Sequence, residues 1–429
     1  MRIPQREPDP RFVNLRDAHV HIHDFGVSLA CLDLSSCRSK EEILQRIAEA
    51  EPDDTGWIRG MRAAPEQWPV AAWPCAEELH EAARRHPCYV RSLDIHSLAA
   101  STEALQRAGI HPDTPDPRDG VIVRRPDGSL DGVLLEGACR AVLDAVPDAS
   151  PEQRKAAIRR ALARFAELGF VEVHDMLSRE WLGPLLREID DEDGGLPVRV
   201  RLCPLLEDAP DHMAARASFE NERIVTTGVK IFTDGALNTR TANMMRPYTR
   251  YAQGLRRGLA LMTQMEIEGA IARCEQLGFP LVAHAIGDAA VGRVLRALER
   301  TKPELPGYRI EHAQFVAAPD IARFAKLRII ASVQPCHLLT DIEPARRLLP
   351  HAESRAFPLR DLVEAYRAEG LDPVDYLWFG SDAPVVPPLP EDNIQGAVHR
   401  RRRDMPEDQA FAPEQAIDEE LALACMQAR

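Results

Sequence analysis

The chain has 429 residues, of which 45% are hydrophobic and 28% charged, a composition typical of a globular protein with a large core. Its formal charge of −14 argues against nucleic acid or an anionic lipid surface as the main partner, and its nine cysteines include no CxxC pair, which suits reduced thiols. No run approaches the roughly 18 apolar residues of a membrane span, and residues 1–8 lack the apolar core of a signal peptide, so we expect a cytoplasmic protein.

Short apolar or β-branched runs predict eight strands, most of them alternating with amphipathic segments. The predicted strands are residues 15–22, 170–176, 198–206, 228–234, 279–287, 308–314, 328–335 and 376–383. The helical patterns cover residues 179–189, 265–277, 289–300, 320–327 and 359–369. A repeated strand-then-helix order calls for a parallel sheet. We therefore predict a (β/α)₈ barrel over residues 15–400, with an open doubly wound sheet as the alternative.

Residues 25–160 interrupt this alternation between the first and second predicted strands. They include a predicted hairpin, residues 121–125 and 130–135, whose turn contains Pro126, Asp127 and Gly128. A segment of this length cannot be a structureless loop, so we predict an inserted subdomain that covers the mouth of the barrel. Asp94 and His96 could reach the site from this subdomain, or they could merely hold it together.

After the predicted barrel, residues 401–429 are expected to form a helical tail. The basic run at residues 399–403 follows a helical stretch, and we interpret it as a solvated helix end, where positive charge is favourable.

His19 and His21 stand at positions i and i+2 of the first predicted strand. Side chains at this spacing share one face of a strand, where two imidazoles can reach one cation. The pair alone is weak evidence, since a strand can carry two histidines for packing. His284, His312 and Asp382, however, also fall at the ends of predicted strands. Catalytic groups of a barrel gather at the carboxyl ends of its strands, so the convergence predicts a metal site there.

Imidazoles and a carboxylate suit zinc and similar divalent ions, and a site without thiolate ligands leaves room for water. Such a metal activates water at neutral pH and polarises a carbonyl. Asp382 could then accept the proton of the attacking water and deliver it to a leaving nitrogen. The alternative role for Asp382 is an N-cap of a helix after the eighth strand.

Lys230 lies within an apolar run of a chain that has only five lysines against 48 arginines. An amine at this position suggests chemistry that a guanidinium cannot perform, such as carboxylation to a carbamate that bridges two metal ions. The alternative is an ammonium group paired with Asp17, Asp175 or Asp382 beside a single metal ion.

Six motifs in this order resemble the amidohydrolase superfamily, and more closely its family 3, the YtcJ-like branch that includes N-substituted formamide deformylases. The motifs are Asp17-Ala-His19-Val-His21, Gly228-Val-Lys230-Ile-Phe-Thr-Asp234-Gly235, His284-Ala-Ile-Gly287-Asp288, Ile310-Glu311-His312-Ala-Gln314, Gln334-Pro335-Cys-His337 and Gly380-Ser-Asp382-Ala-Pro384. The likeness covers about residues 15–400 and includes parts of the insertion.

The resemblance implies a role for each matching residue. His19 and His21 would bind a first metal ion, His284 and His312 a second, with Lys230 as the bridge and Asp382 as ligand and proton shuttle. His337 and Gln334 would face the substrate, with His174 on the second strand as a further substrate contact. For His337, a purely structural hydrogen bond is the alternative.

Two features depart from the family pattern. Only 16 residues precede Asp17 and 47 follow Asp382, so we expect the β-sandwich domain of the family to be absent or vestigial. The face that it would cover is then polar, covered by a second copy in a homo-oligomer, or a liability for solubility. In addition, His23 continues the alternation of His19 and His21, and we expect it on the face of His21.

The sequence thus predicts a zinc-type amidohydrolase that cleaves a non-peptide carbon–nitrogen bond, in an amide or formamide. The alternatives are hydrolysis of an ester or cyclic amide, an isomerisation on the same site, or a catalytically silent metal-binding barrel.

Overall fold

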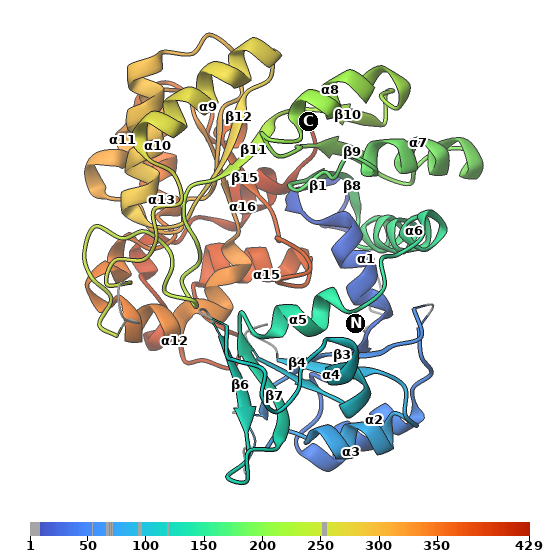
Figure 1. Ribbon diagram of the computed structural model, residues 1–429. Coiled ribbons are helices and arrows are strands. Elements are labelled where there is room, and N and C mark those ends of the chain that lie inside the picture. Colours follow the sequence, from blue (N-terminus) through green and yellow to red (C-terminus); the bar gives the residue numbers. More distant parts are fainter. Residues whose placement is uncertain are drawn as a thin grey trace. The chain divides into compact units, whose positions relative to one another are not determined.

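The computed structural model describes residues 9–53, 55–65, 68, 70, 72–92, 97–117, 120–250 and 255–429. The chain divides into two compact units, one built from residues 26–160 and the other from the segment that ends at Phe25 together with Ala161–Arg429 (Figure 1). Among the described residues, we find no helix with the length and apolar character needed to cross a membrane.

The larger unit contains two sheets of parallel strands. The first has the order β1 (Leu15–Val20), β8 (Phe170–Asp175), β9 (Arg199–Leu202), β10 (Ile224–Thr226). The second has the order β11 (Val229–Phe232), β12 (Leu281–Ala285), β13 (Arg309–His312), β14 (Ile330–Val333), β15 (Leu377–Phe379). All eight strands predicted for this unit are therefore present, and β10 is an additional short strand immediately before β11.

Two isolated parallel bridges connect the sheets. Leu205, just after β9, pairs with Lys230 in β11, and Val20 at the end of β1 pairs with Ala383, just after β15. The strands β1, β12, β13 and β14 are buried on both faces, as expected of parallel strands flanked by helices.

Helices connect the strands in the predicted alternation, which confirms an α/β fold with parallel sheets. They are α1 (Ile22–Ala30), α6 (Pro151–Glu167), α7 (Leu182–Asp193), α8 (Ala209–Ala215), α9 (Gln264–Leu277), α10 (Asp288–Thr301), α11 (Ala318–Lys326), α12 (Leu338–Leu348), α13 (Leu359–Ala368), α14 (Pro373–Tyr376), α15 (Pro390–Ile394) and α16 (Glu419–Met426). In Figure 1, α9 and α10 flank β11 and β12.

The bounds of α9 follow from its end residues. The hydroxyl of Thr263 accepts a hydrogen bond from the backbone amide of Glu266, whose carboxylate accepts one from the amide of Thr263. Gly278 ends the helix with a φ of 77°, a conformation that glycine adopts without strain.

The end of the chain packs against the start of β1. The backbone amide of Ala428 donates to the carbonyl of Asn14, and Leu15 forms an antiparallel bridge with Gln427. Of the described residues after Ala383, only Gln427 makes a bridge of this kind, and α16 with three short 3₁₀ or π segments accounts for the rest of the regular structure after α15.

The interpretation of residues 399–403 as a solvated helix end is wrong for Arg400. Its side chain is buried and donates to three backbone carbonyls, those of Phe411, Phe357 and Ala356. These hydrogen bonds connect the C-terminal segment to the loop before α13. The backbone of Arg400 is left-handed, with a φ of 56°.

The smaller unit has a mixed six-stranded sheet. Its strands are ordered β2 (Leu32–Asp33), β3 (Ile58–Ala63), β4 (Cys88–Ser92), β5 (Ser97–Ala100), β7 (Leu130–Glu136), β6 (Gly120–Arg124). Its helices are α2 (Lys40–Glu49), α3 (Ala76–Ala82), α4 (Thr102–Arg107) and α5 (Cys139–Asp144). The predicted hairpin forms as β6 and β7, and its turn is closed by the amide of Arg125 donating to the carbonyl of Ser129. Two apolar clusters, one around Ile43 and Val90 and one around Trp57 and Leu98, form its core.

Candidate metal centre

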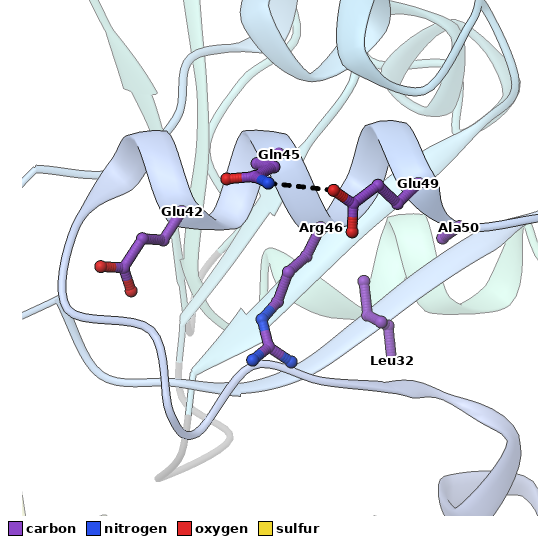
Figure 2. Close-up of a pocket in the computed structure, with 6 residues that line it drawn as sticks. All are labelled: Leu32, Glu42, Gln45, Arg46, Glu49 and Ala50. Atoms are coloured by element: carbon purple, nitrogen blue, oxygen red, sulfur yellow. Dashed lines mark hydrogen bonds between the residues drawn. The ribbon is translucent and has the colours of Figure 1, made fainter.

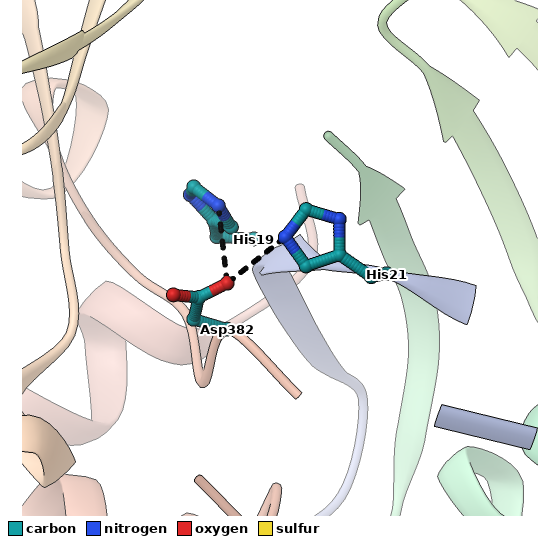
Figure 3. Close-up of side chains that lie close together, drawn as sticks. All are labelled: His19, His21 and Asp382. Atoms are coloured by element: carbon teal, nitrogen blue, oxygen red, sulfur yellow. Dashed lines mark ion pairs between the residues drawn. The ribbon is translucent and has the colours of Figure 1, made fainter. Parts of the chain in front are cut away.

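His19, His21 and Asp382 meet at one point of the larger unit. Oδ1 of Asp382 lies 3.1 Å from Nε2 of His21 and 3.4 Å from Nε2 of His19, so that one carboxylate oxygen faces two imidazoles (Figure 3). The three side chains are a candidate donor set for a metal ion. His19 and Asp382 are buried, while His21 is partly accessible.

Backbone pairing brings these residues together. The amide of Asp382 donates to the carbonyl of His19 at 2.7 Å, and the amide of His21 donates to the carbonyl of Ala383 at 2.8 Å. The carboxylate of Asp175, at the end of β8, accepts a hydrogen bond from the amide of Ile22 and so fixes the chain just after His21. The first motif therefore spans the end of β1 and the turn into α1.

A second candidate donor set consists of His312, His337 and Asp382. Asp382 belongs to both sets. The rings of His312 and His337 are 6.2 Å apart, and Nε2 of His337 lies 4.0 Å from Oδ2 of Asp382. His312 and Asp382 both have left-handed backbone conformations, with φ of 69° and 60°. Such strain in residues other than glycine is concentrated at functional sites in proteins.

His284 belongs to neither of these two sets, although its ring lies 4.5 Å from that of His312. Its Nε2 lies 3.2 Å from the carbonyl oxygen of Gly235, which can only accept a hydrogen bond. Nε2 therefore carries the proton, and Nδ1 is the nitrogen of His284 that can bind a metal ion. On its other side, His284 contacts the ring of Phe232 at 5.1 Å.

Lys230 lies in β11 and is 1% exposed. Its Nζ has no hydrogen-bond partner and is 5.2 Å from the centre of the Phe232 ring. The side chains of Asp17 and Asp175 accept hydrogen bonds from backbone amides instead. A salt bridge from Lys230 to a carboxylate, the alternative considered from the sequence, is thus not formed with any residue that the structure describes.

Burial favours the neutral form of His19, His284 and His312, which is the form that binds metal ions. For His21, burial is outweighed by the neighbouring Asp382 carboxylate, which raises the pKa of His21. Burial and the neighbouring Lys230 lower the pKa of His19 to about 4, and burial lowers the pKa of His284 to about 3. Burial also lowers the pKa of Lys230. Asp382 has its pKa held well below the usual range because His19 and His21 outweigh its own burial.

Glu311, which the sequence placed in a motif without a role, contacts the site directly. Its carboxylate lies 2.6 Å from Nδ1 of His19 and 2.7 Å from the guanidinium of Arg309. Burial alone would raise the pKa of Glu311, but Arg309 and His19 lower it to about 2. The available signal was the run Arg309-Ile310-Glu311, which places two charged residues within a predicted buried strand.

His337, Gln334 and His174, which the sequence predicts to contact the substrate, form hydrogen bonds with other residues of the chain. Nε2 of His337 donates to the carbonyl of Ser381 at 3.1 Å, and the buried amide of Gln334 donates to the carbonyl of Ser332 at 3.3 Å. His174 is buried between Glu172 and Arg309, so both of its nitrogens are occupied. Asp94 and His96 lie outside the described residues.

The expectation for His23 is wrong. The strand ends at Val20 and α1 begins at Ile22, so the alternation of side chains does not continue. His23 instead packs against Trp181 at 5.0 Å and lies 3.2 Å from Asp24.

The smaller unit has a surface hollow of about 520 Å³ beside α2, which Figure 2 shows. Its lining residues are Leu32, Glu42, Gln45, Arg46, Glu49 and Ala50, with Gln45 donating to Glu49. The candidate donor sets found in the described part of the chain lie elsewhere, in the larger unit.

Comparison with known proteins shows the family to which the chain belongs. The model of the amidohydrolase family matches residues 15–424. The chain is 29% identical to the putative amidohydrolase YtcJ of Bacillus subtilis over 400 residues, which are 91% of this chain and 73% of that protein. It is 22% identical to the N-substituted formamide deformylase of Arthrobacter pascens over 339 residues, which cover 74% and 61% of the two chains.

The fold is also found in a solved structure. An uncharacterized metal-dependent hydrolase from Pyrococcus horikoshii OT3 superposes with a TM-score of 0.77 at 24% sequence identity, over 96% of this chain and 78% of that one.

Proposed function

Because the chain belongs to the amidohydrolase family, we propose that it is a metal-dependent hydrolase that cleaves a non-peptide carbon–nitrogen bond in a small amide or formamide. The convergence of His19, His21 and Asp382 on one point carries this proposal. The similarity to a formamide deformylase supports the choice of bond. The proposed fold is a closed (β/α)₈ barrel, which the bridges Leu205–Lys230 and Val20–Ala383 support.

The residues present fit a divalent metal ion. Oδ1 of Asp382 is buried and receives no hydrogen bond of good geometry, although two imidazole nitrogens lie within 3.4 Å of it. With Nδ1 of His19 directed at the carboxylate of Glu311, Nε2 of His19 presents a lone pair to the Asp382 carboxylate. Two acceptors facing each other repel unless a cation lies between them, and zinc suits imidazole and carboxylate ligands.

In the proposed reaction, His19, His21 and Asp382 would hold a first ion, and His284 and His312 would hold a second. Carboxylated Lys230 would be the bridge between them. The metal supplies polarisation of the substrate carbonyl and a lowered pKa for water. Asp382 accepts the proton of the attacking water through Oδ2 and then donates it to the leaving nitrogen, general base and general acid in turn. Its low pKa keeps it ionised for the first of these steps. His337 and Gln334 would contact the substrate beside it.

A substrate screen tests the proposal. Purified protein, with its metal content measured, would be assayed against N-substituted formamides, acetamides, a cyclic amide and an ester. We expect hydrolysis of one amide class, abolished by Asp382→Asn and by a chelator, and unchanged by Asp404→Asn, whose side chain is 80% exposed. Preference for the ester or the cyclic amide would contradict the choice of bond. Bound metal without hydrolysis, unaffected by Asp382→Asn, would indicate a silent metal-binding barrel.

We also propose that the chain forms a homo-oligomer. Sedimentation of the purified chain would test it, since a monomer at all concentrations would contradict it.

A further inference from the structure

Glu311 is fully buried beside the candidate metal centre, yet it belongs to neither donor set. Its Oε2 lies 2.6 Å from Nδ1 of His19. An ionised carboxylate only accepts hydrogen bonds, so the proton between these atoms belongs to Nδ1. The neutral His19 ring then has its lone pair on Nε2, the nitrogen that faces Asp382 at 3.4 Å.

Arg309 forms an ion pair with the Glu311 carboxylate. Its Nη2 lies 2.7 Å from Oε1 of Glu311 and donates to the carbonyl of Ala18, the residue before His19. The same nitrogen donates to the hydroxyl of Ser332 on β14, and Nη1 donates to Nδ1 of His174 on β8. Arg309 therefore contacts both β1 and the carboxylate that orients the His19 ring of that strand.

β1 and β13 are not paired strands, so the contact between His19 and Glu311 is made by side chains alone. A carboxylate that receives the second N–H of a metal-binding histidine fixes both its tautomer and its ring orientation. Here Glu311 accepts the hydrogen bond from Nδ1 of His19, and Arg309 forms an ion pair with Glu311.

We propose that Glu311 is the positioning residue that holds His19 in its Nδ1–H tautomer and thereby sets the affinity of the first metal site. The inference rests on the proposed function for the presence of a metal ion at His19. Glu311 itself contacts neither metal nor substrate in this arrangement.

Glu172, on β8, provides a matched control. Its Oε1 lies 3.1 Å from Nε2 of His174, and its Oε2 accepts hydrogen bonds from Arg199 and Arg201. Like Glu311, Glu172 is a buried carboxylate that contacts a histidine and arginine, but that histidine is not a candidate metal ligand. Glu172→Gln should disturb packing as Glu311→Gln does, but not the metal site.

The first measurement is the tautomer of His19 in metal-free protein, read from ¹⁵N shifts of labelled histidines and assigned with a His19→Gln sample. We expect a proton on Nδ1 in the wild type and a mixture in Glu311→Gln, since the amide can either accept from Nδ1 or donate to it. A wild-type proton on Nε2 would overturn the proposal without reference to any metal ion.

The second measurement is the affinity for Zn²⁺ by competition with a chromogenic chelator. We expect Glu311→Gln to weaken binding about 10-fold to 100-fold, and Glu172→Gln to leave it unchanged. Glu311→Asp, which keeps a charge for Arg309 but withdraws it from His19, should also weaken binding and serves if Glu311→Gln does not fold. Wild-type affinity in both Glu311 variants, or an equal loss in Glu172→Gln, would overturn the inference. Failure of the wild type to bind Zn²⁺ would instead overturn the proposed function.

Discussion

The carboxylate of Asp17 accepts a hydrogen bond from the backbone amide of Ser381 at 2.9 Å. The same oxygen accepts a hydrogen bond from the amide of His19, so one side chain at the middle of β1 holds both segments that present the first donor set. Asp17 therefore holds the backbone of His19 and of Ser381, the residue before Asp382, in position. Its place two residues before His19 allows its carboxylate to reach the amide of His19.

Replacing Asp17 tests this role. Asp17→Ala leaves two buried amides without an acceptor, and we expect the free energy of unfolding to fall by about 2–3 kcal/mol. Asp17→Asn retains a carbonyl oxygen at the same place and should lose much less. Urea unfolding of the two variants, with zinc content measured in parallel, checks the prediction; equal losses in both would mean that the charge, not the acceptor, matters.

Gly380, which follows β15 directly, packs against His19 of β1. A Cβ atom built on it would stand 2.7 Å from both the backbone nitrogen and the Cβ of His19, too close for any real contact. We expect Gly380→Ala to separate Asp382 from His19, to destabilise the fold by about 1–3 kcal/mol and to reduce metal content. Gly269→Ala, in the open middle of α9, is the control and should leave the protein as stable or more so.

Lys230 is expected to be carboxylated. The neutral amine is the form that reacts with carbon dioxide, and burial favours it by lowering the pKa of Lys230. Protein equilibrated with ¹³C-bicarbonate should show a carbamate signal that is absent in Lys230→Met, a variant of similar length. The signal should weaken as the pH falls and the amine becomes protonated. One metal ion beside an unmodified Lys230 would contradict the prediction and leave a mononuclear hydrolase possible.

Most of the strands could be predicted because they are short runs rich in apolar residues, and several end at or just before a polar residue such as His21, Asp175 or Asp382. The contact of His19 with Glu311 could not, because β1 and β13 are distant in the chain and unpaired in the sheets. His23 was misplaced because strand periodicity was extended past the residue where α1 begins. Gln334 and His337 lie near the site, but what they bind depends on a substrate that strand patterns do not encode.

Arg400 was misjudged for a related reason, since a run of arginines has the composition of a solvated surface. We expect Arg400→Met to destabilise the protein by roughly 3 kcal/mol, because three buried carbonyls would lose the hydrogen bond from its guanidinium. Arg403→Met, whose side chain is 54% exposed, should change the free energy of unfolding by no more than about 0.5 kcal/mol. Similar losses in the two variants would argue against a special role for Arg400.

His212, remote in sequence from the candidate site, should make the stability of the larger unit depend on pH. It is buried, Nε2 lies 2.9 Å from the hydroxyl of Thr226, and burial lowers the pKa of His212 to about 4. Below pH 6.5, the ordinary pKa of histidine, His212 is protonated in the unfolded chain but stays neutral in the folded protein, so the free energy of unfolding falls as the pH falls. The loss ends near pH 4, below which His212 is protonated in both states. His212→Gln removes this loss. Between pH 7 and pH 5 the variant should therefore gain on the order of 1 kcal/mol relative to the wild type, measured by urea unfolding. A difference between the two proteins that stays constant over this range would show that His212 titrates alike in both states.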